Sequence, residues 1–240
     1  MPLRVREEIQ EMLREKRIMT TAIVLAAGKS ERMGQGVDKT FLSLVNKPVI
    51  AWSLLAFERC AAIDRIILVV RKDQITASKS VAKMFGISKL QTVVPGGAKR
   101  QESVKAGLDA CDGDTKYVVI HDGARPCVTS ETIAEIADAV RKSPAVTLGR
   151  RMTDTVKRVE RGTAVAETVD REKLWTVQTP QAFQMKTIKH AYAALGRKTV
   201  TDDCQAVELD GGQVKILENS KPNIKITVPE DVLFAASLLK

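Results

Sequence analysis

Short runs of β-branched and other apolar residues alternate, from Thr20 onward, with segments whose apolar residues recur at helical spacing. Continuous apolar runs indicate strands buried on both faces, and the helical segments supply the layers that cover them. The strand-like runs lie at 20–28, 65–70, 90–97 and 117–126, and the helix-like segments at 48–60, 75–86, 100–111 and 130–143, the last with Ser130 as its expected N-cap. This alternation predicts an α/β fold, a Rossmann-like three-layer sandwich with a mostly parallel central sheet.

The loops that follow the predicted strands are expected at one edge of the sheet. Right-handed crossovers between parallel strands bring the carboxyl ends of those strands to the same side. Open α/β sheets bind their ligands in the crevice outside that edge. The residues at the ends of these strands are therefore the first candidates for a functional site.

The segment from about 149 to 178 interrupts this rhythm. Short alternating stretches on either side of Arg161 and Gly162 predict a β-hairpin, which carries many charges but few large apolar residues. Because an isolated hairpin is marginal in water, a protruding arm at about 150–173 is expected to pack on the parent sheet or on a second subunit. The remaining expected elements are helices at 185–196, after Thr201 and from Pro229, and strands at 214–218 and 223–227.

Bulk properties limit the class of partner. The chain has 240 residues, enough for a sizeable core, and its formal net charge of +9 favours acidic partners such as nucleotides, phosphorylated metabolites or nucleic acid. Aromatic residues make up only 4%, so a base-stacking platform for nucleic acid is poorly supplied. No apolar run approaches the roughly 20 residues of a membrane span, and residues 1–19 lack the apolar core of a signal peptide. A cytoplasmic protein with no membrane partner is expected, with 1–19 as an extra helix or a disordered leader.

The residues that could bind soft metals form no motif. The four cysteines include no CxxC pair, so reduced and mostly buried thiols are expected. Only two histidines occur, and without a cluster a histidine metal site is disfavoured. His121 is therefore interpreted as a structural residue.

A glycine-containing loop, LAAGKSERMGQGVDK at 25–39, follows the first predicted strand directly. Its small residues let backbone amides approach a phosphate chain, and its basic residues Arg32 and Lys39 add charge toward a triphosphate. The small residues are Ala26, Ala27 and Gly28. The loop predicts a site for a nucleotide.

Two other classes compete with a phosphate-loop enzyme. An NAD-type oxidoreductase also needs a glycine loop, but Ser30 occupies the place of the middle glycine in GxGxxG, and bases follow the strand at 65–70 where an acidic residue is needed. The loop is not a Walker loop either, which requires GxxxxGK[ST]. A nucleic-acid-binding protein is suggested only by the net charge of +9.

The pattern AAG-x(3)-RM, with a Lys seven residues after the Arg, resembles the signature loop of the nucleotidyltransferases. Further motifs follow in the same order as in the methylerythritol phosphate cytidylyltransferases: PGGAKRQESVKAGL, HDGARP, TDTVKR, TVDREKLW, QTPQAF, TDD and NIKITVPED. The resemblance covers about 20–239. It implies one nucleotidyltransferase domain at 20–240 that joins CMP from CTP to 2-C-methylerythritol 4-phosphate and releases pyrophosphate, with Mg²⁺, on the route to isoprenoid precursors.

The departures from the family pattern are modest. Asp38-Lys39-Thr40 stands where the family usually has Pro-Lys-Gln, which retains the charged lysine but changes the packing beside it. Ala98 stands where some relatives carry an acidic residue near the base. Base contacts there are left to the backbone of Gly97 and to Ser103.

The resemblance assigns roles at the predicted strand ends. Arg32 and Lys39 are the expected catalytic residues, which stabilise the transition state of an in-line attack by the polyol phosphate on the α-phosphorus. Asp122 is the expected ligand of Mg²⁺, because a hard carboxylate suits that ion. The nucleotide-binding residues are expected to be Ala26, Ala27, Gly28, Gly96, Gly97, Arg100, Ser103, Asp122 and Gly123.

The remaining expected residues bind the second substrate. Guanidinium groups suit a bidentate grip on phosphate, while a lysine acts as a point charge. By resemblance the substrate-binding residues are Arg125, Thr155, Arg171, Thr179 and Lys225, with Lys157 beside them in the arm. The resemblance also implies a homodimer whose arm completes the partner's pocket. A different polyol phosphate, such as ribitol 5-phosphate, stays open as the acceptor.

Overall fold

The computed structural model of the chain describes residues 18–28, 30–33 and 38–239. Most of the expected leader at 1–19 lies outside the described residues, and Met19 already belongs to the first strand.

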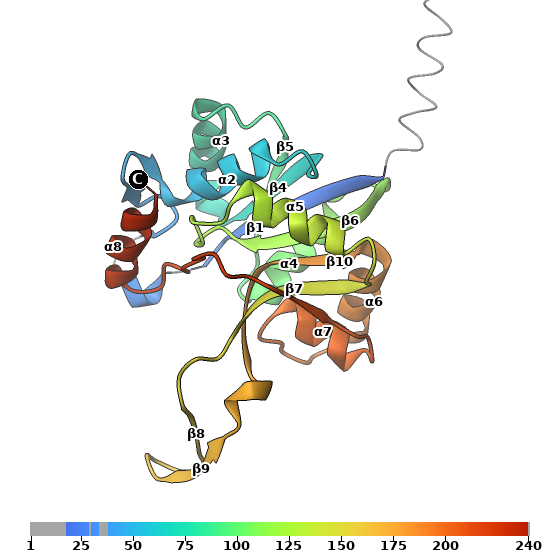
Figure 1. Cartoon of the computed structure of the whole chain (residues 1–240). Helices are drawn as coiled ribbons and strands as arrows, with labels where there is room; N and C mark the ends of the chain where they lie inside the picture. The colour runs from blue at the N-terminus through green and yellow to red at the C-terminus, as the bar shows by residue number, and fades with distance from the viewer. Residues whose placement is uncertain (1–17, 29, 34–37, 240) are drawn as a thin grey trace, which may run out of the picture.

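A seven-stranded sheet forms the centre of the molecule (Figure 1). In spatial order it contains β11 (Lys215–Glu218), β7 (Ala145–Arg151), β10 (Trp175–Gln184), β6 (Thr115–Asp122), β1 (Met19–Ala26), β4 (Arg65–Val70) and β5 (Leu90–Pro95). Only β10 runs antiparallel to its neighbours, β6 and β7, while the other pairs are parallel. The prediction of a mostly parallel central sheet is confirmed.

Helices cover both faces of this sheet. One face carries α2 (Val49–Arg59), α3 (Ile75–Met84) and α5 (Ser130–Ala139), and the other carries α4 (Arg100–Asp109), α6 (Met185–Ala194) and α7 (Asp203–Leu209). Alternation along β1 serves both layers, because Ala22 and Val24 join one apolar cluster while Ile23 and Leu25 join the other. A third cluster packs α8 (Pro229–Leu238) against the short strand β2 (Ser43–Leu44), which pairs with β3 (Lys47–Pro48).

Three sequence-based expectations need correction. The strand expected at 223–227 is irregular backbone, because its polar groups bind other segments: Ile226 N–H donates to the carbonyl of Ala124 at 2.8 Å. The N-cap of α5 is Thr129, whose hydroxyl accepts from the Thr132 amide, and Ser130 is the first helical residue. The strands β7 and β10 were not expected, since they border the charged segment that the hairpin pattern dominates.

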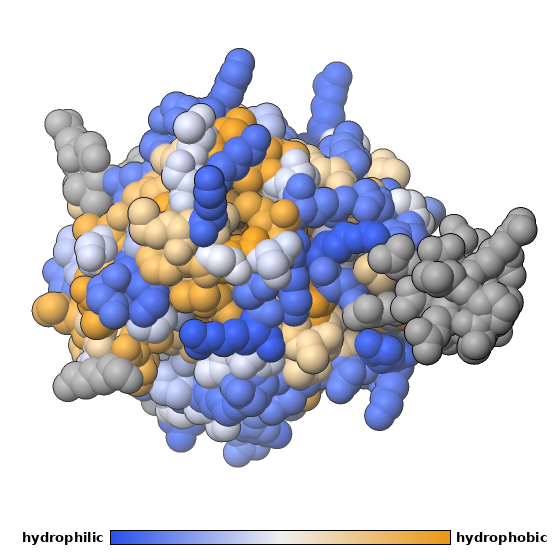
Figure 2. Space-filling model, turned by 90° about the horizontal axis from the view of Figure 1, so that it is seen from above, coloured by the Kyte–Doolittle hydropathy of each residue, from blue (hydrophilic) through white to orange (hydrophobic). Residues whose placement is uncertain are grey.

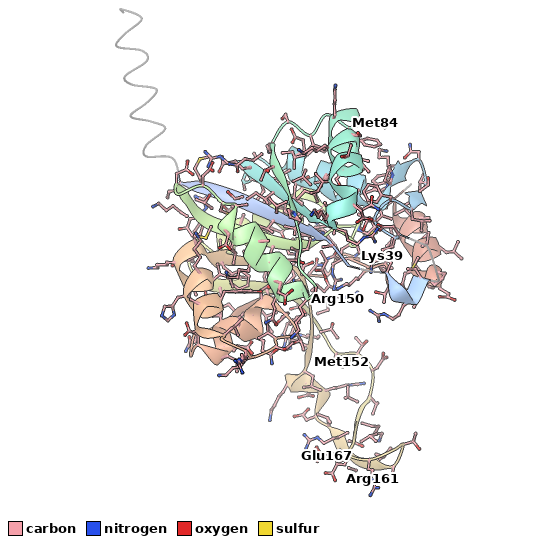
Figure 3. All side chains as sticks on the ribbon, turned by 180° about the vertical axis from the view of Figure 1, so that it is seen from behind. Lys39, Met84, Arg150, Met152, Arg161 and Glu167 are labelled. Carbon is pink, nitrogen blue, oxygen red and sulfur yellow. The ribbon has the colours of Figure 1, made fainter. Side chains whose placement is uncertain are left out.

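The predicted hairpin is confirmed as a two-stranded arm that extends from the body (Figures 1 and 3). Within the described part of the chain, its strands β8 (Val156–Val159) and β9 (Val165–Val169) pair only with each other, and Gly162 adopts φ +62° in the turn between them. Most of their residues are exposed. A short 3-10 helix, Arg171–Lys173, leads back to β10.

Apolar and charged residues are mixed on the surface. Figure 2 shows apolar patches interrupted by hydrophilic side chains on the face seen from above. Among the described helices, none combines the length and hydrophobicity needed to cross a membrane.

The close packing of α4 on the sheet gives a test of the fold. A Cβ added at Gly107 would lie 2.5 Å from Cγ2 of Ile23 and 3.2 Å from Cγ2 of Val69. We expect Gly107→Ala to lower the free energy of unfolding by about 1–3 kcal/mol through overpacking, despite the better helix propensity of alanine. Urea denaturation measures it. Gly113→Ala, where an added Cβ meets no atom within 4 Å, is the control. Equal stability of the two variants would contradict the packing.

Candidate active site

Two hollows open side by side at the carboxyl edge of the sheet, as the topology predicts. The first has a volume of about 330 Å³ and the second about 530 Å³. Loops after β1, β4, β5 and β6 line the first, and β10, α7 and the segment before α8 contribute to the second. Three residues, Arg100, Asp122 and Lys225, line both hollows. A molecule bound in one hollow therefore meets a molecule bound in the other at these three side chains.

Glycines after β5 shape the first hollow. A Cβ at Gly96 would lie 2.5 Å from Cβ of Ala27 and 2.6 Å from Oγ of Ser103, so the backbones approach closely only without a side chain. The amide of Gly97 donates to the Ser103 hydroxyl at 3.2 Å. Ala27, Gly28 and these glycines line a narrow wall that suits a flat base or a phosphate chain.

Lys39 projects from a turn that is fixed at several points. Its amide donates to Oγ of Ser30 at 3.3 Å, and its ammonium donates to the carbonyl of Ile226 at 3.0 Å. Burial, together with the charge of Lys225, lowers the pKa of Lys39. The charge of Arg32 acts in the same direction, although the Arg32 side chain is exposed and outside the lining of either hollow.

The residue before Lys39 fastens this turn to the sheet. One oxygen of Asp38 accepts the Thr40 amide at 3.0 Å, and the other lies 3.1 Å from Nη1 of Arg71. Arg71 follows β4 and lines the first hollow. Its Nε and Nη2 donate to Asp73, each at 3.2 Å. Asp38, which departs from the family pattern, thus forms an ion pair with Arg71. The sequence alone did not indicate this pair.

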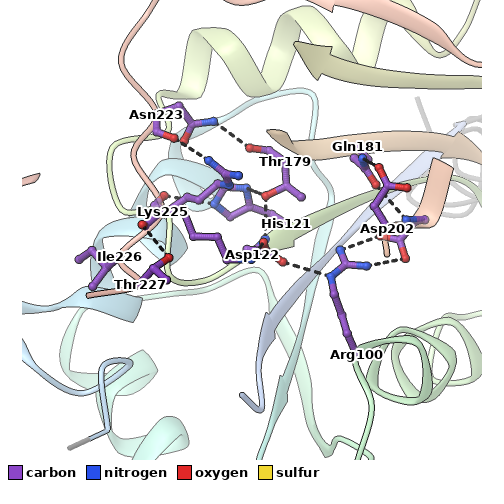
Figure 4. A network of polar contacts seen from close by, with 12 residues as sticks. Arg100, His121, Asp122, Thr179, Gln181, Asp202, Asn223, Lys225, Ile226 and Thr227 are labelled. Atoms are coloured by element: carbon purple, nitrogen blue, oxygen red, sulfur yellow. Dashed lines mark hydrogen bonds and ion pairs between the residues drawn. The ribbon is translucent and has the colours of Figure 1, made fainter. Parts of the chain in front are cut away.

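Asp122 ends β6 and lies at the centre of the site (Figure 4). Nζ of Lys225 donates to Oδ2 at 2.6 Å, and Nε of Arg100 lies 3.4 Å from Oδ1. Burial would raise the pKa of Asp122, but the charges of Lys225 and Arg100 hold it well below its usual range. The carboxylate is therefore ionised at neutral pH.

Arg100 is itself fixed by a second buried carboxylate. Its two terminal nitrogens donate to Asp203 at 2.9 and 2.8 Å, and the Tyr192 hydroxyl donates to the same carboxylate at 2.6 Å. Asp203 is fully buried, and together with Asp122 it raises the pKa of Arg100 against the effect of burial. The TDD motif was the only signal in the sequence for Asp203. The Asp203 side chain fixes the position of the Arg100 guanidinium through these two hydrogen bonds.

Thr179 and His121 lie behind Asp122. The Thr179 hydroxyl accepts the Asp122 amide at 3.0 Å and lies 3.3 Å from Nδ1 of His121. Nε2 of His121 lies 3.3 Å from the carbonyl of Arg125. Burial lowers the pKa of His121 to about 3, so its ring is neutral.

The second hollow receives basic groups from two segments. Arg125 lines it, with Nη1 donating to the carbonyl of Asn223 at 2.7 Å, and burial lowers the pKa of its guanidinium. The Asn223 side chain donates to the carbonyl of Thr179 at 2.8 Å. Irregular backbone at 219–228 thus brings Lys225 and Arg125 to one cavity.

The expected residues of the arm lie away from both hollows of their own chain. Nη1 of Arg171 donates to the carbonyl of Thr153 at 2.6 Å, and Lys157 donates to the Thr168 hydroxyl at 2.6 Å. Thr155, Lys157 and Arg171 are exposed. Figure 3 shows the arm, marked by Met152, Arg161 and Glu167, pointing away from the body that carries Lys39.

Gly123 also lies outside the lining of the hollows. A Cβ there would lie 2.6 Å from Cδ1 of Ile50, and its amide donates to the carbonyl of Leu25 at 2.8 Å. The geometry gives Gly123 a packing role between β1 and α2. Within the described residues, no group of three or more His, Cys, Asp or Glu side chains could hold a metal ion by itself.

The model of the family 2-C-methyl-D-erythritol 4-phosphate cytidylyltransferase matches residues 20–240. The chain belongs to this family. A relative of that name from Desulforamulus reducens is 43% identical over 222 residues, which cover 91% of this chain and 95% of the relative. One from Halalkalibacterium halodurans is 41% identical over 221 residues, with coverages of 91% and 96%.

The fold of this family is also found in solved structures. The crystal structure of 4-diphosphocytidyl-2C-methyl-D-erythritol synthase from Anaerococcus prevotii matches with a TM-score of 0.81 and 33% identity, over 92% of this chain and 98% of that one. The predicted family, fold class and cytidylyltransferase activity are confirmed. Membership in a nucleotidyltransferase family decides against the oxidoreductase alternative.

The two contacts of Asp38 can be tested for their part in fixing the turn around Lys39. Asp38→Ala removes both the Thr40 contact and the Arg71 ion pair. We expect kcat/KM for CTP to fall about tenfold, the equivalent of roughly 1.4 kcal/mol, because Lys39 loses its fixed position. Asp73→Ala, which removes the exposed second partner of Arg71, is the matched control and should change kcat/KM less than about twofold. Steady-state kinetics decide, and equal effects of the two substitutions would contradict the role of Asp38.

Proposed function

We propose that the two hollows bind the two substrates of the family reaction, CTP in the first and 2-C-methyl-D-erythritol 4-phosphate in the second. The phosphate monoester attacks the α-phosphorus of CTP in line, a new phosphoanhydride bond forms, and pyrophosphate leaves. The product is 4-diphosphocytidyl-2-C-methyl-D-erythritol, an intermediate of the non-mevalonate route to isoprenoid precursors. The observation that carries this proposal is the sharing of Arg100, Asp122 and Lys225 by both hollows.

In the first hollow, backbone groups read the base and cations hold the phosphates. Gly96 and Gly97 leave room for the edge of cytosine, and Ser103 fixes the Gly97 amide. Lys39 meets the triphosphate, and Arg32 approaches from its exposed turn. Since the monoester oxygen is already an anion, the chemistry needs positioning and charge stabilisation and no strong general base.

A divalent metal fits this donor set when CTP is bound. Mg²⁺ is commonly held by one or two carboxylates together with phosphate oxygens and waters, and Asp122 offers one ionised carboxylate at the junction of the hollows. Bound there, Mg²⁺ supplies charge stabilisation to the phosphate oxygens. The ammonium of Lys225, which now occupies Oδ2 of Asp122, would be released toward the second hollow.

The second hollow suits a short polyhydroxy chain that ends in a phosphate. Arg125 and Lys225 supply the positive charge, while Gln178, Gln181 and Asp202 supply polar groups along its wall. The Thr179 hydroxyl already binds the Asp122 amide and faces His121. Its contribution is therefore to orient Asp122 as much as to bind substrate.

The arm supports a homodimeric enzyme. Arg171, Thr155 and Lys157 are exposed and line neither hollow of their own chain. They lie on or beside a hairpin with no sheet partner among the described residues. In a two-fold dimer the same arm reaches the neighbour's second hollow, where Arg171 meets the polyol phosphate. We also propose that the enzyme works in the cytoplasm.

A panel of acceptors tests the substrate assignment. Pyrophosphate release is measured with CTP, Mg²⁺ and either 2-C-methyl-D-erythritol 4-phosphate or ribitol 5-phosphate. We expect the methylerythritol substrate to give the higher kcat/KM, and UTP, GTP and ATP to replace CTP poorly. Asp122→Asn should lose Mg²⁺-dependent turnover while it keeps its far-ultraviolet circular dichroism. A preference for ribitol 5-phosphate would establish the alternative acceptor and reject the assignment.

Mixing two inactive variants tests the arm. Lys39→Ala and Arg171→Ala chains should each be nearly inactive alone. If each site takes Arg171 from the partner subunit, one site of a mixed dimer carries both substitutions. The other site then carries neither and stays intact. After subunit exchange, activity should recover to about a quarter of the wild-type value, because about half of the dimers are mixed and each has one good site. Absence of recovery after verified exchange would place Arg171 in its own chain's site.

A further inference from the structure

His121 is fully buried, yet both of its ring nitrogens face functional parts of the site. Nδ1 lies 3.3 Å from the Thr179 hydroxyl and Nε2 lies 3.3 Å from the carbonyl of Arg125. The ring rests on Phe57 of α2, with 5.3 Å between the ring centroids. Buried polar groups generally need hydrogen-bond partners, and here the two partners of the imidazole belong to the two halves of the site.

The partners fix the direction of each hydrogen bond. The Arg125 carbonyl can only accept, so Nε2 carries the proton of the neutral ring and donates to it. Nδ1 is then the acceptor, and the Thr179 hydroxyl donates to it. The oxygen of that hydroxyl in turn accepts the Asp122 amide at 3.0 Å. A single directed chain of hydrogen bonds therefore runs from the Asp122 backbone through Thr179 and His121 to the Arg125 backbone. Figure 4 shows its first three members, Asp122, Thr179 and His121.

This chain joins the two halves of the site. Asp122 faces both hollows, whereas Arg125 lines the second alone. The turn between them is also held by Ser53, whose hydroxyl donates to the carbonyl of Gly123 at 3.1 Å. Among the described residues, the buried Nε of Arg125 has no hydrogen-bond partner, while Nη1 of the same guanidinium donates to the carbonyl of Asn223 at 2.7 Å.

We propose that His121 is a positioning residue for nucleotidyl transfer. Its Nδ1, through Thr179, sets the Asp122 carboxylate for CTP and its metal, and its Nε2 sets Arg125 for the polyol phosphate. The inference rests on the proposed function for the roles of Asp122 and Arg125, but the hydrogen-bond chain itself does not. Binding of CTP and its metal therefore depends on Nδ1, and binding of the polyol phosphate depends on Nε2.

Two amide substitutions separate the nitrogens. In His121→Asn the side-chain carbonyl takes the place of Nδ1 and preserves the acceptor for Thr179, but the side chain is too short to reach the Arg125 carbonyl. In His121→Gln the terminal amide takes the place of Nε2 and preserves the donor to Arg125. We expect His121→Asn to raise KM for the polyol phosphate about tenfold with little change for CTP, and His121→Gln to raise KM for CTP and the Mg²⁺ needed for half-activation by a similar factor.

Thr179 supplies a second, independent test. Thr179→Val keeps the shape of the side chain but removes the hydroxyl, so it should reproduce the His121→Gln pattern. Because Thr179→Val also removes the acceptor of the Asp122 amide, the double variant His121→Gln/Thr179→Val should be no worse than Thr179→Val alone. Thr179→Ser should restore activity. Additive losses in the double variant would overturn the proposal.

The tautomer can be observed without any substrate. The chain has only two histidines, so ¹⁵N-histidine NMR shows two imidazoles, and His190→Gln assigns them. We expect His121 to be neutral with its proton on Nε2; a proton on Nδ1 would overturn the proposal. Arg125→Ala tests the proposed function separately. If this variant leaves KM for the polyol phosphate unchanged, the assignment of the second hollow to that substrate fails, but the tautomer of His121 still tests the hydrogen-bond chain. Identical kinetic patterns for His121→Asn and His121→Gln would reduce His121 to a structural residue.

Discussion

The rest of the site depends on the compensation of one buried charge, the ionised carboxylate of Asp122. A buried charge of this kind is costly unless cations and hydrogen bonds compensate it. Lys225 reaches it from the irregular segment before α8, and Arg100 reaches it from the start of α4. Lys225 and Arg100 come from different segments, and together with Asp122 they line both hollows, so the group of charges that compensates Asp122 also joins the first hollow to the second.

Much of this arrangement could be predicted from the sequence, because it follows from local rules. Apolar runs that end in glycine or aspartate locate the strand ends, and parallel topology brings those ends to one edge. Gly96 and Asp122 could be expected at this edge for that reason, and Lys39 by the family resemblance of the first loop. All three line the first hollow, and their roles stay predictions. The family resemblance added the reaction and the roles expected of these residues.

The rest depends on contacts between distant segments, which no local pattern encodes. The residues 223–227 alternate like a strand, but their backbone groups bind Ala124 and the side chains of Lys39 and Arg125. The pairing of Asp38 with Arg71 and the burial of Asp203 under Arg100 also join positions far apart in the chain. The residues of the arm contact neither hollow of their own chain. Their role in a site is therefore proposed from the two-fold symmetry of a homodimer.

The central claim is that the two substrates meet at Asp122 from separate hollows. A crystal structure with CTP, Mg²⁺ and an unreactive analogue of the polyol phosphate tests it most directly. The account predicts the nucleotide phosphates against Lys39 and Asp122 in the first hollow, with the analogue's phosphate near Lys225 and Arg125 in the second. Both ligands in one hollow, or an Asp122 that contacts only Lys225 and Arg100 in the complex, would contradict the account.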